Sequence, residues 1–599
     1  METGLSKPQT KPPVPAVPAA AQPVTFCDTV GLFTPAAGTA TATAVLFVSP
    51  WGLEEMCLRK FWRMVADDLA GKGVPSLRFD YPGTGDALDR DDYSGGLSIW
   101  ENAVVDAADE LRQRSGCAHI AVISQGLGSA LAVNVAPRIE GLAAIACLAP
   151  VTSGRAFLRE MQIWARVVDE GLGVPEAHRL REGVGIAGLK MPDEIAADFR
   201  KLNLTNLTEA PAPRALVIKR ADRLADGEFA AQLSRLGAEV READYIGYDD
   251  FISNPAISTM PAGIREAVLD WVASVIGALP SKAAPAPASA PAPAMLVGQD
   301  FRELPVTFGD GGRLYGMVCE PLGSRNGATV LILGTAYDRH AGWGRSSALM
   351  ARDLARAGIA SLRFDAANIA DSPPVPGLPE QVLYQDSQVD DVRAALDFLA
   401  RRGLAPVVLA GRCSGGYLTF RSAVADQRVC GAVAVNPFVF YWEPGRNIDE
   451  SLRYMPRSLD VYREKLFQPE TFRRLLQGRV DVRRAIGNMG RAFWRRVMRK
   501  ATPILQALPG TGGEYAEVRK AFHVLLERKM PLTLLYSEND VGFEHFAEHF
   551  GPTGKGLRRY PNVRLEIVPE ADHNFTPAPA RRAYLEALID MARRFPPAA

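Results

Sequence analysis

The chain has 599 residues, which is too long for one ordinary hydrophobic core and predicts two domains of roughly 250 to 300 residues each. Its 68 Lys and Arg residues balance 68 Asp and Glu residues, so the overall charge gives no reason to expect a nucleic acid or an anionic membrane as a partner. No uninterrupted apolar stretch approaches the ~18 residues that a membrane-spanning helix needs. Seven scattered cysteines argue against a disulfide framework, and we expect a reducing, cytoplasmic location.

The chain divides into four segments by composition. Residues 1–23 are broken by prolines and have no apolar core of a signal peptide, so we expect a disordered tail. Short apolar segments alternate with amphipathic ones over residues 24–278 and again over residues 296–599, and a Pro/Ala run at 279–295 predicts a semi-extended linker between them. Such alternation predicts a mostly parallel sheet, flanked by helices, in each half.

The two halves are diverged copies of one another. The pentapeptide SLRFD stands at 76–80 and again at 361–365, and an aspartate follows each copy six residues later, Asp86 and Asp371. Matching strand-and-loop segments precede the pentapeptides, at 42–52 and 328–338. We therefore expect the same fold twice in one chain.

Residues 406–420 of the second half, PVVLAGRCSGGYLTF, run from an apolar strand through small residues into a helix. In a sharp strand-to-helix turn the residues two before and two after the apex must be small. Gly411 and Gly415 satisfy this rule for an apex at Cys413, whereas an apex at Ser414 would require the large Arg412 to fit there. The pattern predicts Cys413 at the apex, where a helix N-terminus favours its thiolate. A structural cysteine at a Gly-rich turn is the alternative.

The order of strand, loop, FD turn, sharp turn and late aspartate resembles two α/β-hydrolase domains in tandem, with cysteine where serine is usual. In that family the catalytic residues follow the chain order nucleophile, acid, histidine. The resemblance implies Cys413 as the nucleophile, Asp540 as the acid and His573 as the base. Because Glu538 and Asn539 neighbour Asp540, the acid is assigned to within one or two residues.

The family pattern also implies further site residues. The backbone N–H groups of Ser414 and Ala336 would form an oxyanion hole. We expect three side chains, Arg412, Tyr337 and Trp494, to belong to the substrate site or its cap.

Residues 436–530 do not fit the sheet pattern, and in this family such an insert forms a helical cap over the active site. Within it, residues 471–500 hold nine Arg and one Lys against a single acid, Asp481. A solvated helix face is one interpretation. The other is a surface for an anionic partner: coenzyme A, an acidic carrier protein or a membrane.

His545 and His549 are spaced as neighbours on one helix face, but Phe546 stands where the HExxH metalloprotease motif needs a glutamate. We interpret both as helix-surface residues and expect no metal and no cofactor.

The first half lacks the catalytic residues that the family pattern requires. Its corresponding turn, SQGLGSA, has its apex at Gly126, which has no side chain. No histidine lies between Asp222, the late aspartate of this half, and the linker, and Asp249 stands where His573 would align. We predict a non-catalytic scaffold, dimerisation surface or binding module.

The resemblance implies an acyl-transfer enzyme that acts through a Cys413 acyl-thioester on a small-molecule acyl thioester, bound to coenzyme A or a carrier protein, or on an ester. Relatives with cysteine at this turn include aminoacyl-shuttling transferases, polyhydroxyalkanoate synthases and dienelactone hydrolase. A plain thioesterase or esterase is the alternative, and a non-catalytic binding protein is the third.

Overall fold

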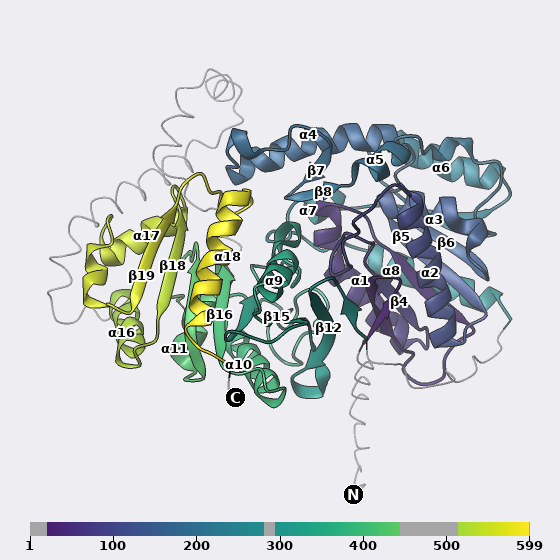
Figure 1. Ribbon diagram of the computed structural model, residues 1–599. Coiled ribbons are helices and arrows are strands. Elements are labelled where there is room, and N and C mark those ends of the chain that lie inside the picture. The colour runs from purple at the N-terminus through teal and green to yellow at the C-terminus, as the bar shows by residue number, and fades with distance from the viewer. Residues whose placement is uncertain (1–20, 281–293, 444–512, 598–599) are drawn as a thin grey trace, which may run out of the picture.

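The computed structural model describes residues 21–280, 294–443 and 513–597, and these form two sheet-centred halves (Figure 1). The first sheet has the strand order β1-β2-β4-β3-β5-β6-β9-β10 and the second has the order β11-β12-β13-β15-β14-β16-β17-β18-β19. Apart from the short edge strand β11, the two orders are the same strand for strand. In the first sheet β2 pairs antiparallel with both of its neighbours, and the strands from β4 onward pair in parallel. The second sheet repeats this pattern around β13 and from β15 onward. The expected pair of tandem α/β-hydrolase folds is thus present.

The strands of the first sheet are β1 Gln22–Phe26, β2 Thr29–Thr34, β3 Thr43–Val48, β4 Ser76–Phe79, β5 His119–Gln125, β6 Leu142–Leu148, β9 Arg214–Lys219 and β10 Glu239–Asp244. Those of the second are β11 Leu296–Val297, β12 Phe301–Phe308, β13 Leu314–Pro321, β14 Thr329–Leu333, β15 Ser361–Phe364, β16 Val407–Arg412, β17 Val429–Val435, β18 Leu532–Ser537 and β19 Val563–Val568.

Helices cover both faces of each sheet. The helices of the first half are α1 Leu53–Gly71, α2 Ser98–Ser115, α3 Leu127–Val135, α4 Gly154–Leu172, α5 Asp193–Phe199, α6 Leu224–Arg235, α7 Tyr248–Ile252 and α8 Ile264–Ala278. Those of the second are α9 Ser346–Arg356, α10 Asp386–Arg401, α11 Ser414–Ala425, α16 Glu514–Glu527, α17 Val541–Phe550 and α18 Ala578–Arg593. The central strands are buried on both sides, as in β3, and such strands read as continuous apolar runs rather than as alternating ones.

Each sheet therefore separates two apolar layers. In the first half α1 and α8 pack on one face, and α2, α3 and α6 on the other. In the second half α9 and α18 cover one face, and α10, α11, α16 and α17 the other. Helix α16 packs its buried residues into this second-half core, so the last part of the expected cap is a layer helix of the sheet. Residues 436–443 of that insert also contribute to this core, and residues 444–512 lie outside the described residues.

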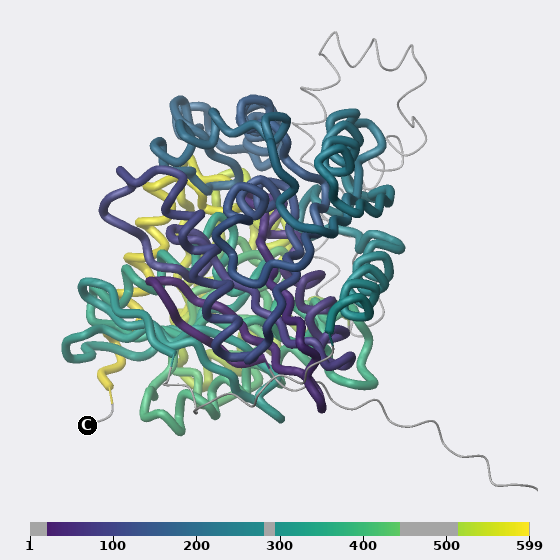
Figure 2. Tube along the Cα trace, turned by 90° about the vertical axis from the view of Figure 1, so that its right-hand side faces the viewer, coloured from purple at the N-terminus to yellow at the C-terminus, as the bar shows by residue number. Residues whose placement is uncertain are grey.

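The two halves meet around the repeated SLRFD segments, and Figure 2 shows the first half lying against the second. The aspartates that follow the two SLRFD copies form ion pairs across this contact. Asp86 pairs with Arg363 of the other half at 3.0 Å, and Asp371 pairs with Arg78 at 3.3 Å. Each arginine belongs to an SLRFD copy, so the segment that the two halves share is the joint between them.

Further buried charges complete this joint. The Nε atom of Arg59 on α1 lies 2.7 Å from Asp371. His340 lies between two aspartates, with Nε2 2.7 Å from Asp86 and Nδ1 3.1 Å from Asp365. Burial lowers the pKa of His340, but these two carboxylates outweigh it and raise the pKa to about 9. Leaving one such buried ion without its partner costs about 3–5 kcal/mol, so the network fixes one arrangement of the halves.

The long helix α4 and the hairpin of β7 (Val184–Ile186) and β8 (Leu189–Met191) extend the first half toward the second half (Figure 1). The Nε2 atom of His178, just after α4, lies 3.2 Å from a carboxylate oxygen of Glu570 in the second half. Among the described residues, every helix is too short or too polar to cross a membrane.

Candidate active site

Cys413 lies at the turn between β16 and α11, with a φ of +56° and a ψ of −120°. Residues with side chains seldom adopt this backbone conformation, and it persists where the surroundings hold it. A Cβ atom on Gly411 would lie 2.3 Å from the carbonyl oxygen of Gly415, and one on Gly415 would lie 2.6 Å from that of Gly334. Close backbone contacts therefore require the small residues on both sides of this turn.

The structure brings His573 and Asp540 together beside this turn. The Nδ1 atom of His573 lies 2.5 Å from Oδ2 of Asp540, whose Oδ1 accepts a hydrogen bond of 2.8 Å from the N–H of Gly542 at the start of α17. The imidazole of His573 also acts on the Cys413 thiol, since its charge lowers the pKa of that thiol. Among the neighbouring acid candidates, Asp540 is the residue that meets the histidine. The three side chains follow β16, β18 and β19, at the carboxyl ends of parallel strands.

The electrostatics of the site favour an ionised pair. Burial raises the pKa of the Cys413 thiol, but the charge and hydrogen bond of His573, together with Arg412, outweigh burial and leave this pKa below its ordinary value of 9.0. Burial lowers the pKa of His573, whereas Asp540 and Cys413 raise it, to about 10. Thiolate and imidazolium thus stabilise one another, and a thiolate is the nucleophilic form of cysteine.

The loop after β14 is tied to the turn at Cys413. The backbone N–H of Ala336, which has a φ of +47°, donates a hydrogen bond of 2.7 Å to the side-chain oxygen of Ser414. The Thr335 hydroxyl donates to the carbonyl oxygen of Arg412 at 2.9 Å. The two residues expected to provide an oxyanion hole therefore lie close together. The Ala336 N–H is engaged in a hydrogen bond to the Ser414 hydroxyl.

Arg412, expected in the substrate site or its cap, contacts two other loops through its guanidinium. Its guanidinium donates a hydrogen bond to the side chain of Asn574, next to His573, and lies 3.8 Å from a carboxylate oxygen of Asp338. Burial raises the pKa of Asp338 to about 6, and Arg412 acts in the opposite direction. Since its side chain is 9% exposed, Arg412 links three loops inside the protein.

Asn436 has a structural role that sequence reasoning missed. Its amide nitrogen donates hydrogen bonds to the Ser537 hydroxyl at 2.8 Å and to the carbonyl oxygen of His573 at 3.0 Å. Its amide oxygen accepts one from the Ser537 N–H at 2.8 Å. A polar residue directly after the apolar β17 was the one signal available, and nothing in the sequence gives its partners.

Tyr337 lines a cavity of about 450 Å³ that lies between the halves. The first half contributes Lys60 and other α1 residues together with residues 255–260, and the second half contributes residues 368–370 and 380–381. The first half therefore forms one wall of the space beside the loop that carries Ala336. Trp494 lies outside the described residues.

The corresponding turn of the first half repeats the backbone without the chemistry. Gly126 has a φ of +55° and a ψ of −125°, close to the values of Cys413. A Cβ atom there would lie 2.4 Å from a carboxylate oxygen of Glu54, which is buried and accepts hydrogen bonds from Gln125 at 2.9 Å and Tyr248 at 3.2 Å. Burial raises the pKa of Glu54. This carboxylate fills the space that a nucleophile at position 126 would need.

The two aspartates considered in the first half do not reach this turn. The Asp222 side chain is 76% exposed and lies 3.6 Å from Arg223. Asp249 is exposed, and Tyr248 beside it points to Glu54 instead. Beside the turn of the first half, Glu54, Gln125 and Tyr248 therefore stand in place of a catalytic acid and histidine.

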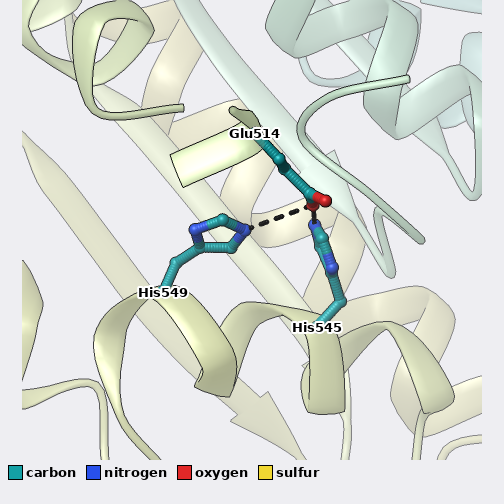
Figure 3. Close-up of side chains that lie close together, drawn as sticks. All are labelled: Glu514, His545 and His549. Carbon is teal, nitrogen blue, oxygen red and sulfur yellow. Dashed lines mark ion pairs between the residues drawn. The ribbon is translucent and has the colours of Figure 1, made fainter. Parts of the chain in front are cut away.

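Our interpretation of His545 and His549 as helix-surface residues is wrong. Their side chains are 15% and 3% exposed. Both imidazoles face one carboxylate oxygen of Glu514, at the start of α16 (Figure 3). The rings of Phe440 and Tyr515 pack against the two imidazoles, and the helical spacing alone did not reveal this cover.

The comparisons with known proteins each cover about half of the chain or less. Solved structures with a similar fold include an esterase from Pyrococcus furiosus (14% identity, TM-score 0.31, 49% of this chain and 91% of that one) and dienelactone hydrolase from Anabaena variabilis (15%, 0.29, 50% and 100%). A 2,6-dihydroxy-pseudo-oxynicotine hydrolase is similar at 14% identity, with a TM-score of 0.28, over 50% of this chain and 69% of that one. No curated protein matches the chain. Residues 326–586, in the second half, match the sequence model of the alpha/beta hydrolase family.

Proposed function

We propose that the second half is an acyl-transfer enzyme whose nucleophile is Cys413, with His573 as the base and Asp540 as the acid. The observation that carries this proposal is a thiol at a strained turn together with a histidine whose charge lowers the pKa of that thiol and whose Nδ1 atom lies 2.5 Å from a carboxylate oxygen. A nucleophile next to a base, with a third group that orients the base, is the recurring arrangement for covalent catalysis.

The chemistry runs in two steps. In the first, the Cys413 sulfur attacks the carbonyl carbon of the acyl donor, and the carbonyl oxygen takes up negative charge. The backbone N–H groups of Ser414 and Ala336 would stabilise that charge once the Ser414 hydroxyl has released the Ala336 N–H. Collapse of this intermediate breaks the bond to the leaving group, which takes a proton from His573, and an acyl-thioester remains on Cys413. In the second step an acceptor loses its proton to His573, attacks the thioester and releases the thiolate.

Cysteine at this position favours transfer between thiols. The acyl-enzyme is itself a thioester, so exchange with a donor of the pantetheine type is close to balanced in energy. We propose an acyl thioester of coenzyme A or of a carrier protein as the donor class, or an ester. Hydrolysis, with water as the acceptor, is the second candidate, because the match of residues 326–586 to the alpha/beta hydrolase family supports hydrolase chemistry in general.

The first half serves this reaction as a scaffold in our proposal. It has no side chain at the apex of its turn, and Glu54 fills that space. Its α1 helix and residues 255–260 form part of the cavity beside Tyr337. A third possibility, binding without catalysis, is disfavoured by the electrostatic match between Cys413 and His573, which a binding site would not need.

The test is turnover of a panel of acyl thioesters and esters by the purified full chain. Thiol release is followed with and without added thiol, amine and alcohol acceptors, and products are identified by mass. Cys413→Ala and His573→Ala should each lower the rate about 10⁴-fold or more. An acceptor-dependent acylated product supports transfer, and free acid in all mixtures supports hydrolysis. Equal turnover by the wild-type chain and Cys413→Ala would refute the proposal.

A further inference from the structure

A cluster separate from the Cys413 site has the composition of a metal site. It consists of Glu514, the first residue of α16, and of His545 and His549, which lie one turn apart on α17. The ligand atoms of these three side chains lie within 4.8 Å of one another. Figure 3 shows both imidazoles turned toward the same carboxylate, from helices that approach each other at this point.

The distances suit one small cation. The Glu514 Oε1 atom lies 3.3 Å from Nε2 of His545 and 3.6 Å from Nε2 of His549. For zinc, with bonds of about 2.0–2.2 Å to nitrogen and oxygen, tetrahedral geometry places neighbouring ligand atoms about 3.3–3.5 Å apart. The carboxylate–nitrogen distances therefore match those of ligands arranged around an ion.

The Nε2 atoms of both imidazoles lie next to the Glu514 carboxylate. The backbone N–H of Phe440 donates a long hydrogen bond of 3.4 Å to Nε2 of His545, which identifies that nitrogen as an acceptor. It nevertheless faces a carboxylate oxygen, which is also an acceptor. Within the described residues the buried Nε2 of His549 makes no hydrogen bond. A cation between these atoms would give the Nε2 atom of His549 a partner and would bridge both imidazoles to the Glu514 carboxylate.

The surroundings also resemble those of metal-bound histidines. The other ring nitrogen of His545 lies 3.8 Å from a carboxylate oxygen of Glu548, which is longer than a hydrogen bond but places an acidic side chain on that side of the ring. The Tyr515 ring packs on His549 with ring centroids 4.7 Å apart, which limits the motion of that imidazole.

We propose that Glu514, His545 and His549 bind one divalent transition-metal ion of the Zn²⁺ class. Two histidines and one glutamate are a recurrent zinc ligand set that leaves a fourth position for water. The ion would join the start of α16 to α17, the helix that begins directly after Asp540. This site is independent of the acyl chemistry proposed for Cys413.

The test is metal binding by the full chain after treatment with a chelator and dialysis. ZnCl₂ is titrated in competition with a chromophoric chelator, and bound zinc is measured by mass spectrometry of the metal. We expect one equivalent for the wild-type chain, and at least a 100-fold weaker affinity for Glu514→Gln and for the double variant His545→Ala/His549→Ala. His119→Ala, which changes a histidine of the first half, is the matched control and should bind as the wild type does.

Two further measurements distinguish this ligand set from a cysteine ligand and from loss of the fold. CoCl₂ in place of zinc gives thiolate-to-cobalt absorption if a cysteine is a ligand, and the proposal expects none and unchanged binding by Cys413→Ala. Urea unfolding in the presence of chelator tests whether each variant is folded, and Glu514→Gln carries the conclusion if the double histidine variant is not. Zinc binding that survives in Glu514→Gln and in the histidine variant, binding that is lost in Cys413→Ala, or no binding by the wild-type chain would overturn the proposal.

Discussion

Asp371 is the residue whose replacement tests the joint between the halves most sharply. Its side chain is fully buried, 2.7 Å from Arg59 and 3.3 Å from Arg78, two arginines of the first half. Burial alone would raise the pKa of this carboxyl, but Arg59 and then Arg78 outweigh it and lower the pKa from 3.8 to about 2. Asp371→Asn keeps the shape of the side chain and removes the charge.

The size of the effect follows from these values. A pKa lowered from 3.8 to about 2 corresponds to about 2.4 kcal/mol of stability at neutral pH. The two arginines would also lose a buried partner, and breaking such a pair costs about 3–5 kcal/mol. We therefore expect Asp371→Asn to lower the free energy of unfolding by about 2–5 kcal/mol, with a lower midpoint of urea unfolding.

The pH dependence gives a second readout of the same residue. A carboxyl whose pKa is lowered by folding contributes its full stability above the unfolded value of 3.8 and loses it as the pH falls toward about 2. The difference between the wild type and Asp371→Asn should therefore stay constant from about pH 8 to about pH 5 and shrink below about pH 4.

A surface aspartate provides the control. Asp353 is 46% exposed and pairs with Arg356 on the same helix, so Asp353→Asn should cost at most about 0.5 kcal/mol. Circular dichroism and fluorescence report the unfolding of both variants. If Asp371→Asn unfolds at the same urea concentration as Asp353→Asn, the ion pairs of Asp371 with Arg59 and Arg78 do not hold the two halves together.

Three predictions concern the turns themselves. Gly126→Cys in a Cys413→Ala background should not restore acylation and should destabilise the chain, because the new Cβ would lie 2.4 Å from Glu54 on backbone with a φ of +55°. Gly415→Ala should lower the rate of acyl turnover at least about 10²-fold, since its Cβ would lie 2.6 Å from the carbonyl oxygen of Gly334 and would push the turn from the oxyanion loop. The alkylation rate of Cys413 by iodoacetamide should rise with pH at a midpoint below 9.0, and in His573→Ala the midpoint should move above 9.0, because burial then raises the pKa with less opposition.

Each of these has its own control. A covalent acyl adduct on the cysteine of Gly126→Cys would contradict the non-catalytic role of the first half. Gly323→Ala, whose Cβ would meet no atom within 4 Å, should keep full turnover. If Gly323→Ala and Gly415→Ala lose turnover equally, the clash with Gly334 is not the cause of the loss. Cys27, whose pKa is raised to about 11 by burial and by Asp106, is the internal control, because its alkylation in the same samples should not change with His573→Ala. A midpoint for Cys413 that stays the same in His573→Ala would refute the ion pair.

Much of the fold followed from the sequence because local patterns carry it. The apolar runs of the central strands and the repeated SLRFD segments predicted two similar sheets, and the strand orders agree. The small residues around Cys413 predicted its turn, because the rule for the residues two before and two after the apex can be read from five consecutive residues.

The remainder depends on contacts between distant residues. The pairing of Asp86 with Arg363 spans 277 positions, and nothing local to either residue indicates it. The same holds for Arg412, whose partner Asn574 lies 162 residues away, and for His549, whose burial depends on neighbouring helices. A helical spacing gives the face on which a side chain lies, and the tertiary fold decides what covers that face.

The central claim is that Cys413 forms the acyl-enzyme, and the most direct measurement is the mass of the intact chain after rapid mixing with acyl thioesters and esters, followed by peptide mapping. We expect a gain of one acyl group on the peptide that contains Cys413, absent in Cys413→Ala and formed more slowly in His573→Ala. An adduct of the same size that persists in Cys413→Ala would contradict the claim.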